Sequence, residues 1–229
     1  MTPVYEDNHI IIVDKAPGEI VQGDKTGDTP LSELVKAYLK EKYAKPGNVF
    51  CGVVHRIDRP VGGLVIFAKT DKALTRLNKM LRENQIHKTY LAIVEGHPAK
   101  DSDTLHHWIT SVERNNKSYA HDSQVPGSRE SILKYRVLAR GERYSLVEVD
   151  LITGRKHQIR VQLSTIGHPI KGDLKYGARR SNPEGSISLR SHRIRFVHPV
   201  STADIDLTAP LPDSDPLWHV LMSHVNDEL

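Results

Sequence analysis

Residues 54–69 read Val54-His55-Arg56-Ile57-Asp58-Arg59-Pro60-Val61-Gly62-Gly63-Leu64-Val65-Ile66-Phe67-Ala68-Lys69, and the rest of the chain can be understood in relation to them. Asp58 stands between two arginines and is followed by Pro60, a glycine pair and an apolar run. A short run rich in β-branched and aromatic residues favours a strand, so Leu64 to Ala68 is predicted to be a buried strand. Asp58 is therefore expected in the loop that enters a core strand.

The charges around Asp58 indicate a reactive carboxylate. Neighbouring cations favour the charged form of an Asp, so we expect Asp58 to be ionised at neutral pH and available as a nucleophile or base. An Arg-Asp-Arg ion-pair cluster that only fixes the loop is the structural alternative. Cys51 and His55 could form a nucleophilic pair, but no third orienting group is visible and a packed thiol is favoured.

Composition restricts the class of protein. The chain has 229 residues, of which 38% are hydrophobic and 26% charged, and it has no low-complexity linker or repeat, so a single catalytic domain over residues 1–229 is predicted. No apolar run approaches the length of about 18 residues that suggests a membrane span. Met1 to Asp7 lacks the pattern of a signal peptide. One cysteine excludes an internal disulfide and suits the reducing cytoplasm.

The excess of positive charge gathers in the last third of the chain. The net charge is +4, and residues 155–195 contain only Asp173 and Glu184 as acids. The basic residues of this segment are Arg155, Lys156, Arg160, Lys171, Lys175, Arg179, Arg180, Arg190, Arg193 and Arg195. Such a segment could bind an RNA phosphate backbone or could form a solvated basic surface.

Hydrophobic periodicity predicts an alternation of strands and helices. The expected strands are His9–Val13, Leu64–Ala68, Lys88–Gly96, Ser131–Ala139, Tyr144–Leu151 and Leu189–Val197. Helices are expected to begin at Thr29-Pro30 and Thr70, and to cover Lys156–Ile166 and Asp213–Val225. Residues 99–130 are polar and poorly periodic, which favours surface loops or short strands. Lys15-Ala16-Pro17-Gly18 is predicted to form a turn, to which we assign no functional role.

Two further stretches carry notable polar residues. Lys88-Thr89-Tyr90-Leu91-Ala92-Ile93-Val94-Glu95-Gly96 is one of the predicted strands. Thr153-Gly154-Arg155-Lys156-His157-Gln158-Ile159-Arg160 opens a predicted helix, and Gly167-His168-Pro169-Ile170-Lys171-Gly172-Asp173 follows it. On that helix His157, Arg160 and Ser164 share one face, so Arg160 could reach a cleft.

In order, these stretches resemble the H-R-x-D-R-x-x-x-G-L, K-x-Y-x-A-x-V-x-G, T-G-R-x-H-Q-I/L-R and G-H-P-I-x-G-D motifs of the RluA-type pseudouridine synthases. The resemblance implies an α+β pseudouridine synthase fold, in which helices flank a mixed, mostly antiparallel central sheet and the active site lies in a cleft. It further implies that Asp58 is catalytic, that Tyr90 stacks on the target uracil and that Arg160 pairs with Asp58. Val61-Gly62 replaces the hydroxyl residues common in the family.

The predicted activity is therefore isomerisation of a uridine, flipped out of a ribosomal or transfer RNA, to pseudouridine. Arg56 could fill the vacancy in the base stack, and no metal or organic cofactor is required. The candidate RNA-binding residues are His55, Arg56, Arg59, Arg155, His157, Lys171, Lys175, Arg179 and Arg180. The last four are expected on an exposed loop. The protein is expected to be a cytoplasmic monomer.

Two other classes of function remain open on sequence grounds. A carboxylate-based glycosidase or nucleosidase would usually need a second positioned carboxylic acid, and none stands out near the motifs. A non-catalytic RNA-binding module would not need Asp58, Tyr90 and Arg160 together. Release of free uracil would favour the first alternative, and binding without any product would favour the second.

Overall fold

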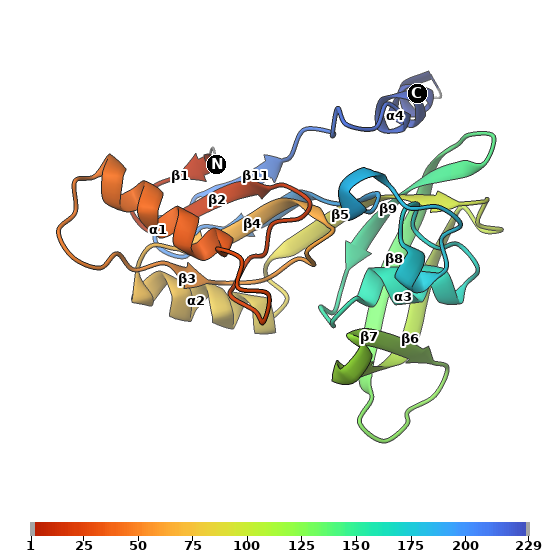
Figure 1. The fold of residues 1–229 in the computed structure, drawn as a ribbon, viewed down its shortest axis with the longest axis horizontal. Coiled ribbons are helices and arrows are strands. Elements are labelled where there is room, and N and C mark those ends of the chain that lie inside the picture. Colours follow the sequence, from red (N-terminus) through yellow and green to blue (C-terminus); the bar gives the residue numbers. More distant parts are fainter. Residues whose placement is uncertain (1–2, 228–229) are drawn as a thin grey trace. The chain divides into compact units, whose positions relative to one another are not determined.

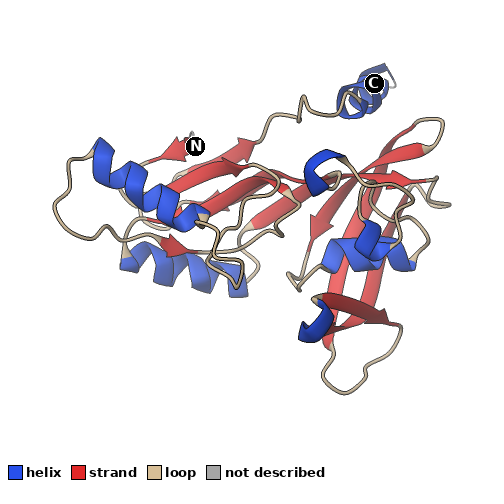
Figure 2. Ribbon diagram, in the orientation of Figure 1, coloured by secondary structure: helices blue, strands red, loops and turns tan. Residues whose placement is uncertain are grey.

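The structure is a computed structural model that describes residues 3–227, and its chain divides into two compact units (Figure 1). The first unit comprises Met1–His87 and Ser191–Ala209, and the second comprises Lys88–Arg190 and Pro210–Leu229. Each unit combines helices with antiparallel strands, which confirms the predicted α+β class (Figure 2). A single catalytic domain over residues 1–229 stays a prediction, because it concerns how the two units act together.

The first unit is built on a sheet with strand order β1-β2-β4-β10, to which β3 adds beside β4 and β11 beside β10. Its strands are β1 (Pro3–Glu6), β2 (Ile10–Lys15), β3 (Gly52–Val53), β4 (Gly62–Ala68), β11 (Asp204–Thr208) and most of β10 (Leu189–Val197). Its helices are α1 (Leu31–Lys42) and α2 (Asp71–Arg82). Strands β2 and β4 pair antiparallel from Ile10 opposite Ala68 to Lys15 opposite Gly63.

Strand β4 confirms the predicted core strand, since all of its residues are buried. Alternate side chains of a strand point to opposite faces, and both faces of β4 are covered. Leu64 and Ile66 pack in one hydrophobic cluster with Leu77 of α2. The side chain of Thr70 caps α2 as predicted, because its oxygen accepts a hydrogen bond from the Ala73 amide at 3.2 Å. These contacts fix the strand that follows the Asp58 loop.

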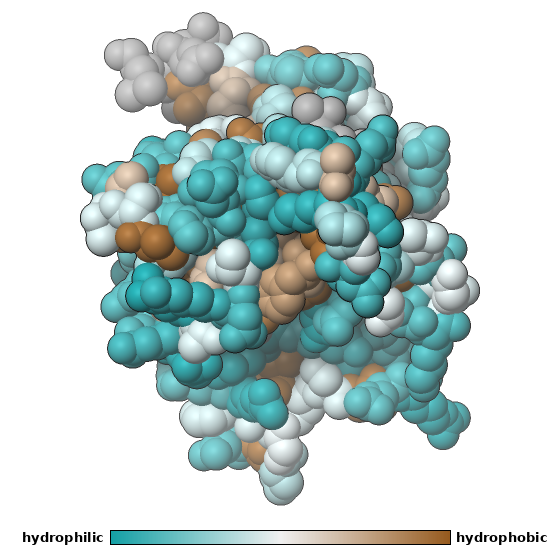
Figure 3. Space-filling view, turned by 90° about the vertical axis from the view of Figure 1, so that its left-hand side faces the viewer, coloured by the Kyte–Doolittle hydropathy of each residue, from teal (hydrophilic) through white to brown (hydrophobic). Residues whose placement is uncertain are grey.

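Helix α1 begins one residue later than the sequence suggested. Its N-cap is Pro30, without a side-chain hydrogen bond, so the prediction that Thr29 caps the helix is wrong. The helix buries Leu31, Val35 and Leu39, and its exposed side is mostly charged but includes Leu34. Hydrophilic residues dominate the face of the molecule at the α1 end of Figure 1, which Figure 3 turns toward the viewer.

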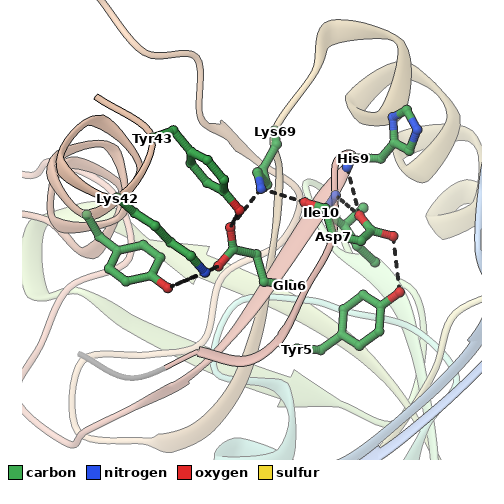
Figure 4. A network of polar contacts seen from close by, with 9 residues as sticks. Tyr5, Glu6, Asp7, His9, Ile10, Lys42, Tyr43 and Lys69 are labelled. Carbon is green, nitrogen blue, oxygen red and sulfur yellow. Dashed lines mark hydrogen bonds and ion pairs between the residues drawn. The ribbon is translucent and has the colours of Figure 1, made fainter. Parts of the chain in front are cut away.

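A carboxylate on β1 ties α1 to the sheet (Figure 4). Glu6 accepts hydrogen bonds from Lys42 and Lys69, at 2.7 and 2.8 Å, and from the hydroxyls of Tyr38 and Tyr43. Burial alone would raise the pKa of Glu6, but these hydrogen bonds outweigh it and lower the pKa to about 2. The carboxylate is therefore charged and fully used in holding the helix, the first strand and the end of β4 together.

The second unit has the strand order β5-β9-β8-β6-β7. Its strands are β5 (His87–Glu95), which starts at the unit boundary, β6 (Ser102–Val112), β7 (Lys117–His121), β8 (Arg129–Arg140) and β9 (Tyr144–Leu151). Its α-helices are α3 (Gln158–Thr165) and α4 (Leu217–Asp227), and short 3-10 turns are η1 (Glu113–Asn115), η2 (Leu174–Tyr176) and η3 (Pro183–Gly185). The strands predicted over Ser131–Ala139 and Tyr144–Leu151 are confirmed as β8 and β9, which pair antiparallel. The prediction of surface loops or short strands over residues 99–130 is wrong for β6, which is an 11-residue strand, and is confirmed for the five-residue β7 and the loop that follows it.

The two helices of this unit also depart from their predicted starts. Helix α3 begins at Gln158, because His157 has a left-handed backbone with φ of 55° and cannot continue a helix. Helix α4 begins at Leu217 rather than Asp213, where Asp215 accepts a hydrogen bond from the Leu217 amide at 3.1 Å. None of the helices in residues 3–227 combines the length and the apolar composition that a membrane span needs.

Gly63 marks a close approach between β4 and β10. Its φ is +115°, and a β-carbon at this position would lie 2.6 Å from the backbone nitrogen of Ser191. The Ser191 hydroxyl also donates a hydrogen bond to the Leu64 carbonyl at 3.1 Å. Only glycine combines this backbone conformation with this separation, so the start of β4 depends on it.

We predict that Gly63→Ala lowers the free energy of unfolding by roughly 3 kcal/mol or more, because left-handed strain adds to overlap with β10. Gly27→Ala is the matched control, since Gly27 also has a positive φ but nothing lies within 4 Å of its β-carbon position. The control is expected to cost only about 1–2 kcal/mol. Urea denaturation measures both values, and equal costs would contradict the close-approach argument.

Candidate active site

Asp58 lies in the first unit, in the loop between β3 and β4, as the sequence predicted. The carbonyl of Asp58 accepts a hydrogen bond from the Val61 amide at 3.0 Å, which closes a tight turn around Pro60. Ile57 and Val61 are buried on either side, whereas Asp58 itself is half-buried. The carboxylate is thus carried by a short segment with an apolar anchor at each end.

A buried lysine that sequence reasoning left without a role supports this loop. Lys15, the last residue of β2, is fully buried, and its ammonium donates hydrogen bonds to the carbonyls of Ala16, Glu19 and Arg59 at 3.0, 2.8 and 3.2 Å. Burial lowers the pKa of Lys15 to about 8, against the attraction of Glu19 and then Asp58. The ammonium therefore fixes the backbone beside Asp58 and contributes positive potential to it.

Arg59 binds the neighbouring turn. Its Nε donates to the Gly18 carbonyl at 3.0 Å, its guanidinium pairs with Asp28, and the Gly18 amide donates to the Arg59 carbonyl at 2.8 Å. Arg56 is exposed. An Arg-Asp-Arg cluster is therefore the wrong interpretation for Arg59, whose partner is Asp28. Its predicted contact with RNA stays a prediction.

His55 and Cys51 do not behave as a nucleophilic pair. The His55 Nε2 accepts a hydrogen bond from the Ile66 amide at 3.2 Å, which fixes the ring against β4. Burial raises the pKa of Cys51 to about 12, so the thiol is protonated at neutral pH. The packed thiol favoured by the sequence fits this geometry.

The second unit holds the other two candidate catalytic residues. Tyr90 is buried on β5, opposite Val149 of β9. Arg160 is buried on α3 and makes a two-pronged contact with Asp173, with Nε to Oδ2 at 2.7 Å and Nη2 to Oδ1 at 2.9 Å. Its guanidinium also lies 5.0 Å from the ring centroid of Tyr176. The predicted pairing of Arg160 with Asp58 stays a prediction.

Asp173 and Tyr176 are functional candidates that sequence reasoning missed. The available signal was the Gly172-Asp173 pair that ends the fourth motif, because a buried arginine needs a carboxylate within reach. The Tyr176 hydroxyl accepts a hydrogen bond from the Ser118 amide at 2.8 Å and contacts His157 Nδ1 at 2.8 Å. His157 is buried, so this contact positions the start of α3.

The predicted basic loop is only partly exposed. Lys175, Arg179 and Arg180 are exposed, but Lys171 is half-buried and binds Asp215 at 2.7 Å and the Asn182 side chain at 2.9 Å. Placing Lys171 on an exposed loop was therefore wrong, because its ammonium anchors the segment before α4. Arg155 is half-buried, and its Nε donates to the Glu130 carbonyl at 3.0 Å. Contacts of these residues with RNA stay predictions.

We predict that Arg160→Ala lowers the free energy of unfolding by about 3–5 kcal/mol, because it leaves the Asp173 carboxylate charged and buried. Arg193→Ala is the matched control, since Arg193 makes a similar two-pronged pair with Asp206. The side chains of the first pair are 6% and 1% exposed, and those of the control pair are 43% and 47% exposed. The control should cost about 1 kcal/mol or less. Urea denaturation compares them, and similar losses would show that burial does not govern the pair.

A second prediction concerns alkaline pH. The pKa of Lys15 is about 8 in the folded protein against 10.5 for a free lysine, so the unfolded chain binds more protons between these values. The free energy of unfolding contributed by this group therefore rises with pH in that window, by on the order of 3 kcal/mol at most. Lys15→Met should lack this rise. Urea denaturation of both proteins across the window measures the difference, and parallel curves would contradict the depressed pKa.

Comparisons with known proteins agree with the motifs. A family model described as RNA pseudouridylate synthase matches residues 9–165. Ribosomal large subunit pseudouridine synthase C of Vibrio cholerae is 32% identical over 91% of this chain and 65% of that protein, so the chain spans about two thirds of its length. Synthase D of Zymomonas mobilis is 31% identical over 96% of this chain and 72% of that protein. The structure of human RNA pseudouridylate synthase domain containing 4 superposes on this chain with a TM-score of 0.78 and 19% sequence identity. The superposition covers 98% of this chain and 92% of the human chain, so the two share a fold. The chain belongs to the RluA-type RNA pseudouridine synthase family.

Proposed function

We propose that this protein isomerises a uridine in RNA to pseudouridine, with Asp58 as the residue that acts on the flipped-out nucleotide. The observation that carries the proposal is the Asp58 loop itself. A half-buried carboxylate sits on a segment whose backbone is held by the buried ammonium of Lys15 and by the turn to Val61. A nucleophile or base needs this kind of fixed geometry, and a loop held so firmly costs little to order when substrate binds.

The proposed reaction breaks the bond between uracil N1 and the ribose and forms a bond from uracil C5 to the same ribose carbon. The C5 hydrogen leaves as a proton and a proton is restored to nitrogen, so the product is an isomer of the substrate. No oxidant, reductant or other reactant is consumed. Asp58 would act on the ribose carbon as a nucleophile or on a proton as a base, beside the attracting positive charge of the Lys15 ammonium.

Tyr90 and Arg160 are proposed to complete the site. Tyr90 would stack on the uracil, since a planar ring can support any base. Arg160 would face Asp58 while Asp173 holds its guanidinium in one orientation. The fixed Arg160–Asp173 pair supports a positioning role, because a planar guanidinium held at two points has little freedom to rotate.

The proposed substrate is large-subunit ribosomal RNA, which the names of the Vibrio and Zymomonas relatives specify for those proteins. Transfer RNA remains the alternative from the sequence. The exposed side chains of Lys175, Arg179 and Arg180 are suitable for contacts with phosphates. We propose that the chain acts as a monomer in the cytoplasm.

We predict that Asp58→Asn keeps the fold and RNA binding but lowers pseudouridine formation by several orders of magnitude, because no other group replaces the nucleophile. Asp71→Asn is the matched control, as Asp71 is an exposed acid at the start of α2 in the same unit. Pseudouridine would be mapped in total RNA from cells with and without each protein and quantified on ribosomal transcripts. A fully active Asp58→Asn protein would refute the assignment. Free uracil as the product would favour a nucleosidase.

A further inference from the structure

Lys88 is a second lysine with unusual surroundings, and the catalytic proposal does not use it. It lies near the start of β5, two residues before Tyr90, and its side chain is half-buried. Residues i and i+2 of a strand point to the same face, about 6.6–6.8 Å apart. The side chains of Lys88 and Tyr90 therefore leave the strand on the same face of the sheet.

Within residues 3–227 the Lys88 ammonium has no hydrogen bond or ion pair. Asp150, on the adjacent strand, accepts a hydrogen bond from Thr89 at 3.0 Å and so lies on the opposite face. Burial lowers the pKa of Lys88, and no acid offsets this effect. Partial burial of a cation without a counter-ion costs free energy in the protein alone. An anion that binds from solution and pairs with the ammonium offsets that cost.

The surroundings of Lys88 leave room for such an anion. Within residues 3–227, and apart from the neighbours of Gly154 in the chain, the Lys88 nitrogen at 3.8 Å is the only heavy atom within 4 Å of the β-carbon position of Gly154, so the absent side chain leaves the ammonium uncovered on that side. Gly154 is exposed, and the loop that carries it is held by Gln158, which accepts hydrogen bonds from the Thr153 hydroxyl and the Arg155 amide at 2.8 and 3.0 Å. The opening is therefore part of a fixed loop.

We propose that Lys88 and the open backbone at Gly154 form a binding site for a phosphate of the RNA backbone next to the uridine that stacks on Tyr90. This inference rests on the proposed function, because it takes RNA as the ligand. A backbone phosphate is permanently charged, so it would act as the counter-ion of the Lys88 ammonium. The exposed Lys156, two residues after Gly154, adds to the positive potential of the same loop.

The test is RNA binding by the full chain, with oligouridylate as the probe and salt concentration as the variable. Lys88→Met keeps the length of the apolar stem without the charge, and should weaken binding about tenfold or more. It should also make the slope of log affinity against log salt shallower by about 0.7. Lys88→Arg should retain the slope. Lys134→Met is the matched control, because Lys134 is exposed and lies level with Asp150 and Thr89 on the opposite face.

A second arm separates a phosphate from a base as the partner of Lys88. The probe is oligouridylate with an uncharged methylphosphonate backbone, on which wild type and Lys88→Met should bind equally. A Lys88→Met defect that persists on this probe, or that equals the Lys134→Met effect on ordinary RNA, overturns the phosphate site. These readouts measure binding alone, so they separate failure of the site from failure of the proposed reaction, which pseudouridine mapping judges.

Discussion

The burial of the Lys15 ammonium is the constraint on which the arrangement of the first unit depends. A cation removed from water must recover its hydrogen bonds within the protein, and Lys15 does so with carbonyls from its own turn and from Arg59. The turn after β2 and the Asp58 loop therefore cannot move independently. Gly18 and Arg59 reinforce the same connection, because the Gly18 amide donates to the Arg59 carbonyl and the Arg59 side chain donates to the Gly18 carbonyl. The sheet thus determines where the carboxylate lies, even though Asp58 belongs to a loop.

The second unit also contains a buried cation, and there a carboxylate supplies the hydrogen bonds. Arg160 is too buried to be solvated, and Asp173 satisfies it through two hydrogen bonds while Tyr176 covers one face. Ion pairs of this kind contribute little net stability, yet removing one partner is costly. Their value here lies in orientation, because the guanidinium plane is fixed before any substrate arrives. Lys88 differs from both, since no carboxylate in the described part of the chain pairs with it.

Elements with strong apolar patterns could be predicted from the sequence, and elements shaped by polar contacts could not. Strand β4 and helix α2 follow from an apolar run and from a capped periodic pattern. Strand β6 was missed because one of its inward positions is His107, which is buried against the Gln162 side chain and disguises the alternation of Leu105 and Ile109. For the candidate site, the motifs indicated Asp58, Tyr90 and Arg160. They did not indicate that Lys15 fixes the Asp58 loop or that Asp173 pairs with Arg160. Lys15 is 44 residues from Arg59 in sequence, so only the folded backbone brings them together. Asp173 is 13 residues from Arg160, but a nearby acid in the sequence does not show that its carboxylate turns toward the guanidinium.

The path of the chain through the first unit affects how it can be synthesised. Its sheet takes β10 and β11 from residues 191–209, after the whole middle of the chain has been made. Chains emerge from the ribosome N-terminus first, so β4, apolar on both faces, has one edge paired with β2 and the other paired only at Phe67 and Ala68 with β3 until β10 arrives. Unpaired apolar edges are prone to associate with other chains, and pairing across such a long interval is slow. The newly made chain is therefore most vulnerable to aggregation after the Asp58 loop has formed and before Ser191 closes against Gly63.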